Sequence, residues 1–218
     1  MLDIIILSIF AGLTIRGLKV SDREPGEIPT KVTNKLGRLW DIAHEGMKYN
    51  RLVRAEKALL TILKIDDKNA AAYNRLGILY AKQKEYKDAI DCFEIASTID
   101  PTASSLHNLG LIYYETENYP KAATAFEQAL KMEDDMAARH IAYAKVQEKL
   151  GNGKLMIDEL KTAVELEPNR ESYTLLMKGY ESMGMQAEAD LIADKIKKPP
   201  KAAEVKPKKV SRPKRVVI

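Results

Sequence analysis

The sequence predicts an all-α fold, an α-solenoid of about five stacked helix-turn-helix hairpins in a chain of 218 residues. Three observations lead to this prediction. A residue pattern around Gly77 recurs around Gly110, thirty-three residues later. Apolar residues within each copy follow the i, i+3, i+4, i+7 spacing of amphipathic helices. Helix-breaking residues separate one copy from the next.

The two clearest copies share small and aromatic residues at matching positions. The first copy contains Tyr73, Leu76, Gly77, Tyr80, Ala89, Phe93, Ala96 and Pro101. The second contains Leu106, Leu109, Gly110, Tyr113, Ala122, Phe126 and Ala129, with Asp134 in place of the proline. Because each hairpin leaves apolar surface that only the next hairpin can cover, the copies must stack.

Individual residues explain how one copy folds. A glycine such as Gly77 costs a helix up to about 1 kcal/mol relative to alanine, so we expect a neighbouring helix to approach closely there. Phe93, between small residues, is predicted to insert between helices. Pro101 disfavours the helical conformation at Asp100, so the second helix is expected to end at that point.

Weaker copies extend the pattern on both sides. A third copy starts near Ala137, has Ala144 in place of the mid-helix glycine, and turns at Leu150–Gly153. A fourth begins near Arg170, and one further copy precedes the clear pair from about Leu36. Terminal copies are expected to be atypical because they cap the stack.

This pattern and period resemble the tetratricopeptide repeat. The resemblance implies a right-handed superhelix whose concave face, lined by the first helix of each unit, binds an extended peptide or a partner helix. Transferred to this sequence, the register gives the partner-binding residues Asn74, Ile78, Lys82, His107, Leu111, Tyr114, Ile141 and Lys145. For any single one of them, a solvent-facing residue without a role is an equal alternative.

Other repeat positions are expected to pack rather than bind. These packing residues are Leu76, Gly77, Phe93, Leu109, Phe126 and Ala129. The sequence contains no P-loop, no G-x-S-x-G and no C-x-x-C motif. His44, His107 and His140 have no metal-ligand spacing. We therefore expect no enzyme activity, no metal or other cofactor, and no small-molecule substrate.

The N-terminal region differs from the repeats because it holds the charge-free apolar run Ile4–Ile15. Twelve helical residues extend about 18 Å, and the stretch from Leu2 to Val20 comes closer to the ~30 Å hydrocarbon core of a bilayer. Arg16 and Lys19 follow the run, so the positive-inside rule places the repeats in the cytoplasm. We favour a membrane anchor over two alternatives, a cleaved signal and a helix packed on the repeats.

The C-terminal segment 197–218 has nine basic residues, one acid and four prolines, which predicts a disordered basic tail. Its net charge of +8 leaves −4 for the rest of a chain whose net charge is +4. Such a tail can bind anionic lipid or nucleic acid through charge alone, or serve only as a solubilising segment.

The predicted organisation is therefore an apolar segment 1–20, a linker 21–35, a solenoid 36–196 and a tail 197–218. The favoured function is a non-catalytic scaffold, in the style of bacterial membrane proteins, that binds protein partners in its groove and is anchored to the membrane. The alternative is a soluble cytoplasmic adaptor that associates with nucleic acid or the ribosome through the basic tail.

Overall fold

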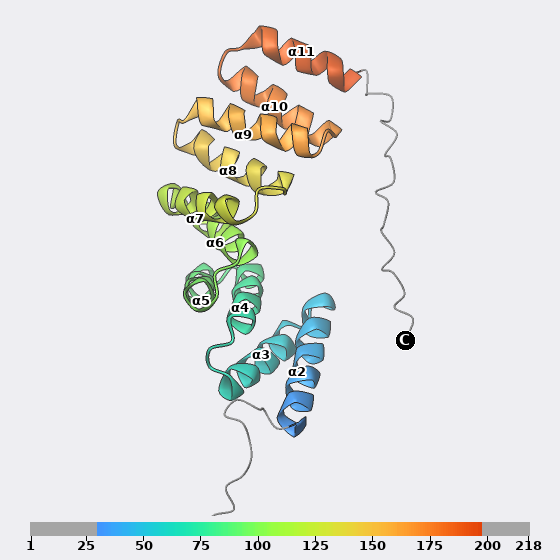
Figure 1. The fold of residues 1–218 in the computed structure, drawn as a ribbon, viewed down its shortest axis with the longest axis vertical. Coiled ribbons are helices and arrows are strands. Elements are labelled where there is room, and N and C mark those ends of the chain that lie inside the picture. Colours follow the sequence, from blue (N-terminus) through green and yellow to red (C-terminus); the bar gives the residue numbers. More distant parts are fainter. Residues whose placement is uncertain (1–29, 198–218) are drawn as a thin grey trace, which may run out of the picture.

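The structure is a computed structural model that describes residues 30–197, and this part of the chain folds entirely into helices and short loops (Figure 1). Ten helices form five hairpins stacked along the long axis of the molecule. The hairpins pair α2 (Thr30–Lys48) with α3 (Leu52–Ile65), α4 (Ala70–Gln83) with α5 (Tyr86–Ile99), α6 (Ala103–Glu115) with α7 (Tyr119–Met132), α8 (Ala137–Lys149) with α9 (Gly153–Leu166), and α10 (Arg170–Ser182) with α11 (Gln186–Lys197). The predicted all-α solenoid of five hairpins is confirmed.

The turn inside each hairpin has the same backbone geometry. One residue in every turn has a positive φ, and these residues are spaced by 33 or 34: Asn50, Lys84, Glu117, Gly151 and Gly184. Glycine adopts this left-handed conformation readily, whereas lysine and glutamate adopt it at a cost. The backbone therefore repeats five times, including hairpins whose side chains have diverged.

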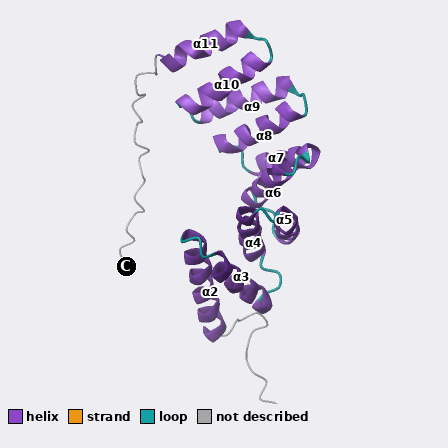
Figure 2. Ribbon diagram, turned by 180° about the vertical axis from the view of Figure 1, so that it is seen from behind, coloured by secondary structure: helices purple, strands orange, loops and turns teal. Residues whose placement is uncertain are grey.

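Consecutive hairpins touch through the second helix of one and the first helix of the next, and the view from behind shows the same order (Figure 2). The buried residues form three clusters along the stack, one around α2–α4, one around α5–α8 and one around α8–α11. This arrangement is typical of repeat proteins, in which each unit contacts only its neighbours.

The mid-helix glycines lie under aromatic rings. A Cβ atom built on Gly77 would lie 2.7 Å from Cε1 of Phe93, and one on Gly110 would lie 2.9 Å from the ring of Phe126. Both rings are almost fully buried. The expected close approach of the second helix to the first is therefore confirmed, and the approaching group is the phenylalanine side chain.

The first helix begins earlier than the sequence pattern indicated. We expected a linker up to residue 35, but α2 starts at Thr30, directly after Pro29. Apolar residues at Val32, Leu36 and Leu39 keep helical spacing, which explains the earlier start. The predictions for residues 1–20, for the rest of the linker and for the tail from residue 198 lie outside the described residues. Between residues 30 and 197, no helix is both long and apolar enough to cross a bilayer.

Candidate partner-binding groove

The first helices of the central hairpins form one continuous face. α4 contacts α6, and α6 contacts α8, in addition to the contacts inside each hairpin. A direct link joins the first two of these helices, because Asn108 Nδ2 donates a hydrogen bond of 3.4 Å to Asn74 Oδ1. This face is the one on which the repeat register placed the partner-binding residues.

A cavity of about 300 Å³ opens between α6, α8 and the start of α10. Its lining includes five of the eight residues predicted from the sequence, namely His107, Leu111, Tyr114, Ile141 and Lys145. Phe126 and two alanines, Ala138 and Ala142, complete the apolar part. The structure thus brings the predicted residues of the second and third repeats together in one hollow, next to a buried aromatic ring.

A smaller hollow of about 140 Å³ continues the groove towards α10. Ile141 and Lys145 line both hollows, so they form the ridge between them. Lys178 and Leu175 of α10 line the far side. Two adjoining hollows with apolar floors and charged rims suit consecutive side chains of an extended chain.

The three predicted residues on α4 lie outside both hollows. Asn74 is half-buried and accepts the hydrogen bond from Asn108, whereas Ile78 packs against the central core cluster. Lys82 is exposed near the end of α4. These residues continue the same helical face, but the structure does not bring them into the cavity.

Four charged residues of the hollows were missed from the sequence: Glu115, Glu148, Glu171 and Lys178. A signal for Lys178 existed, because it holds the place in the fourth repeat that Lys145 holds in the third. Carrying the register one repeat further would have found it. Glu115 and Glu148 were signalled in the same way, because Glu115 lies one period after Lys82 and Glu148 lies one period after Tyr114. Glu171 belongs to another repeat position, and its place in the cavity depends on how α10 stacks after α9.

His107 is a half-buried polar side chain of the cavity. Its imidazole lies edge-on against the Phe126 ring, with centroids 5.4 Å apart, and its Nδ1 finds no hydrogen-bond partner among residues 30–197. Burial lowers the pKa of His107, and the nearby Arg139 guanidinium lowers it further. A neutral imidazole is both a donor and an acceptor, so it can bond to a peptide amide of either polarity.

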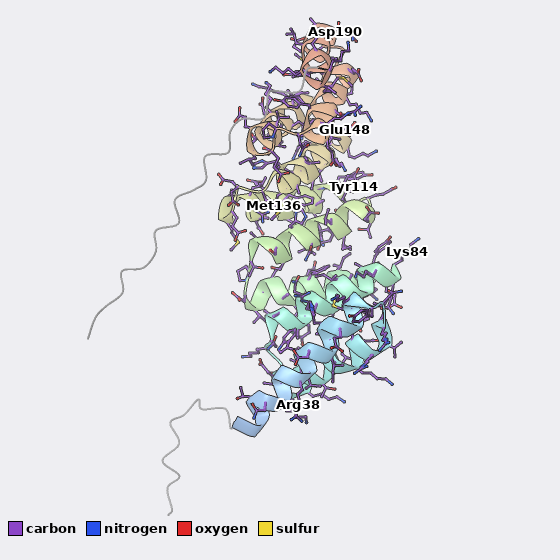
Figure 3. The ribbon with its side chains drawn as sticks, turned by 90° about the vertical axis from the view of Figure 1, so that its right-hand side faces the viewer. Arg38, Lys84, Tyr114, Met136, Glu148 and Asp190 are labelled. Atoms are coloured by element: carbon purple, nitrogen blue, oxygen red, sulfur yellow. The ribbon has the colours of Figure 1, made fainter. Side chains whose placement is uncertain are left out.

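Tyr114 is fixed at the other side of the cavity by a second aromatic contact. Its ring meets that of Tyr119 edge-on at a centroid distance of 5.6 Å. Figure 3 shows Tyr114 at the margin of the stack, on the same side as Lys84. Because the ring is held by α7, little side-chain freedom remains to be lost when a partner binds.

The acidic loop between α7 and α8 has a structural explanation. Asp134 stands where the equivalent loop of the first copy has Pro101, and two buried side chains tie the loop instead. Arg139 forms an ion pair of 3.2 Å with Glu133 and also donates to the Glu133 carbonyl. His140 bonds to the Asp134 carbonyl at 2.8 Å through Nε2 and to Glu159 at 2.7 Å through Nδ1.

The histidines and the cysteine in the described part of the chain are the residues relevant to metal-site and thiol chemistry. No cluster of metal-ligating side chains occurs between residues 30 and 197. Burial raises the pKa of the Cys92 thiol to about 11, with further contributions from Asp88 and Asp91. The thiol therefore stays protonated at neutral pH and acts as a packing residue.

The sequence matches two family models, both described as tetratricopeptide repeat, over residues 68–135 and 107–170. No curated protein sequence matches the chain.

Solved structures share the fold at low sequence identity. A crystal structure of MamA protein has a TM-score of 0.69 at 20% identity, covering 76% of this chain and 92% of that one. Residues 41-end of MamA from Desulfovibrio magneticus RS-1 give 0.69 at 14% identity, with 75% and 94% covered. YrrB, described as a TPR protein with an unusual peptide-binding site, gives 0.63 at 20% identity, with 71% and 80% covered. Residues 68–170 thus match models of the tetratricopeptide repeat, and the five stacked hairpins of residues 30–197 have the solenoid fold of tetratricopeptide repeat proteins.

Proposed function

We propose that the protein is a non-catalytic scaffold that binds an extended peptide segment of a partner protein in the groove formed by α6, α8 and α10. The observation that carries the proposal is the convergence of His107, Leu111, Tyr114, Ile141 and Lys145 on one cavity. Leu111 is 38% exposed, although leucine is usually buried, so its side chain is available to a partner.

The size and chemistry of the groove favour an extended segment. A hollow of about 300 Å³ is at the small end of ligand pockets and accepts side chains one at a time, while a helix needs a broader trough. Leu111 and Ile141 provide an apolar anchor above the buried Phe126 ring. His107 and Lys145 add groups that can hydrogen bond to the backbone of the partner. The similarity to YrrB, whose description names a peptide-binding site, is consistent with this proposal.

The proposal includes a membrane tether at the N-terminal side, with the repeats in the cytoplasm. It is supported by the charge-free run Ile4–Ile15 and by Arg16 and Lys19 directly after it. A tethered groove would hold its partner close to the membrane and raise the local concentration of that partner. The tether predicts that the full chain sediments with membranes and that deletion of residues 1–20 releases it.

Photo-crosslinking tests the groove. A benzoylphenylalanine placed at Tyr114 in cells should yield a crosslinked partner that mass spectrometry identifies, and a synthetic peptide from the crosslinked segment should bind the purified chain. The matched control is the same probe at Met132, which is exposed on α7 and lines neither hollow. Equal yields of the same partner from Tyr114 and Met132, or a peptide that binds equally well to the variant Ile141→Asp, would refute the groove.

A further inference from the structure

A third groove, larger than the two described above, lies on the first hairpin. It has a volume of about 750 Å³ and runs between α2 and α3. Leu39 and Ile42 of α2 face Val53 and Ala58 of α3 across it. The partner-binding groove is built from other helices, so this surface requires a separate explanation.

The groove opens at the end of the stack, on the side of α3 that faces away from α4. Val53, Lys57 and Thr61 line it, and their spacing of four residues places them on one face of α3. Glu56 lies on a different face, where its carboxylate accepts a hydrogen bond of 3.1 Å from Tyr80 of α4. The groove is therefore an outer surface of the solenoid and is not a contact between neighbouring hairpins.

Apolar and basic side chains alternate along this surface. Val53 is 61% exposed within the groove. Tyr49, which precedes the lining residue Asn50 in the chain, is 60% exposed, and the Lys48 ammonium lies 5.4 Å from its ring centre. Arg51, Arg54 and Lys57 line the same groove, and none of the three forms an ion pair within residues 30–197. Exposed apolar side chains beside unpaired bases are the composition of surfaces that lie in a lipid headgroup layer.

The distribution of charge along the solenoid points the same way. Residues 30–65 contain eight Lys and Arg against three Asp and Glu, a net charge of +5. Residues 66–197 contain sixteen bases against twenty-three acids, a net charge of −7. Figure 3 shows the two ends, with Arg38 on the first hairpin and Asp190 on the last. A negatively charged surface attracts the first hairpin and repels the rest of the stack.

The position of the first hairpin in the chain favours a lipid surface as its partner. It is the first element that the structure describes after residues 1–20, and nine residues, such as those from 21 to 29, span at most roughly 30 Å. We propose that the outer face of the first hairpin rests on an anionic lipid surface, with Val53 and Tyr49 in the headgroup layer and Arg51, Arg54 and Lys57 against lipid phosphates. This rests on the tether in the proposed function, and it stands the solenoid upright on the membrane.

A site-specific fluorescent probe tests the contact in the full chain. An environment-sensitive dye is attached at Val53→Cys, with Cys92→Ala to make the label unique, and the chain is reconstituted into vesicles of phosphatidylcholine with or without phosphatidylglycerol. Phosphatidylglycerol should shift the emission to the blue, and a quencher carried on the lipid should reduce it. The same dye at Leu191→Cys, 65% exposed on α11, should show neither change.

Charge variants separate this surface from the rest of the chain. Arg51→Gln, Arg54→Gln and Lys57→Gln together should abolish the blue shift. Lys149→Gln, Lys154→Gln and Lys195→Gln, which remove the same charge elsewhere, should leave it intact. Circular dichroism of both variants checks that the repeats remain folded.

Each alternative gives a distinguishable result. A chain that sediments with vesicles while the dye at residue 53 stays in water refutes the lipid contact and leaves the tether intact. A dye at residue 53 that is already shielded without vesicles refutes it too, because another part of the chain or a second copy then covers the groove. Failure of the full chain to sediment with phosphatidylcholine refutes the tether alone, since the dye still reports whether the hairpin meets anionic lipid.

Discussion

The ring of Phe93 occupies the space that a side chain on Gly77 would need, with 2.7 Å between Cε1 and the position of a Cβ. The same relationship holds for Phe126 and Gly110. In the fourth hairpin both members change together, because Ala144 takes the glycine position and the smaller Leu160 takes the phenylalanine position, both in one core cluster. These three hairpins therefore keep about the same combined volume for the pair.

Gly77→Ala is therefore expected to lower the free energy of unfolding by about 1–2 kcal/mol, since overpacking outweighs the better helix propensity of alanine. Adding Phe93→Leu should cost less than the sum of the two single changes, because the leucine makes room for the new methyl group. Urea unfolding followed by circular dichroism measures both effects. Gly37→Ala is the control, because nothing lies within 4 Å of a Cβ there. A loss at Gly37 equal to that at Gly77 would contradict this account.

The turns offer a route to a more stable protein. Lys84 and Glu117 have φ values of 63° and 60°, so Lys84→Gly and Glu117→Gly should each raise the unfolding free energy by about 1 kcal/mol. Gly151→Ala should lower it by a similar amount, although a Cβ there meets no neighbour within 4 Å. Thermal melting of the three variants gives the comparison. If Lys84→Gly is destabilising, the left-handed turn is not the source of strain.

Two tyrosine–glutamate pairs tie hairpins together and predict how stability depends on pH. Burial, with the Glu56 hydrogen bond, raises the pKa of Tyr80 to about 12, and burial with Glu94 raises the pKa of Tyr113 as well. The folded state thus holds these protons more tightly than the unfolded chain, whose tyrosines titrate near 10. The stabilisation is complete below about pH 10 and is lost as the pH rises towards 12.

The comparison of Tyr80→Phe with the natural protein tests this dependence. The natural protein should lose unfolding free energy between about pH 10 and 12 more steeply than the variant, because the variant cannot release that proton. Urea unfolding at several pH values gives the two slopes. Identical slopes would show that folding does not raise the pKa of Tyr80.

Substitutions at different positions of one repeat should affect either partner binding or stability. Leu111→Ala changes a 38% exposed side chain in the cavity and is expected to alter stability by no more than about 0.5 kcal/mol, while reducing the crosslink yield from Tyr114. Phe126→Ala empties a fully buried site and should cost about 3–5 kcal/mol. Circular dichroism measures the stability of each variant, and the crosslink yield from Tyr114 measures its binding to the partner. A Leu111→Ala variant that unfolds would place this residue in the core.

Much of this fold could be predicted because its information is local and repeated. The pair of copies around Gly77 and Gly110 set the period, and breakers such as Pro101 and Gly151 set the ends of helices. The five groove residues that converge on the cavity also follow from the repeat register. The buried Arg139 and His140 could not be predicted, because their roles depend on where the loop carbonyls of Glu133 and Asp134 lie in space. The early start of α2 was missed because no copy precedes it for comparison.

The three separate clusters of buried residues have a consequence for how damage spreads along the molecule. A substitution that empties the space around Phe93 weakens the contacts of two hairpins, yet the cluster around Leu160 and Leu176 shares none of those residues. The loss of structure caused by a destabilising substitution should therefore stay confined to the hairpins that share its cluster of buried residues. A molecule in which one cluster has unfolded locally then keeps the hairpins at its far end folded.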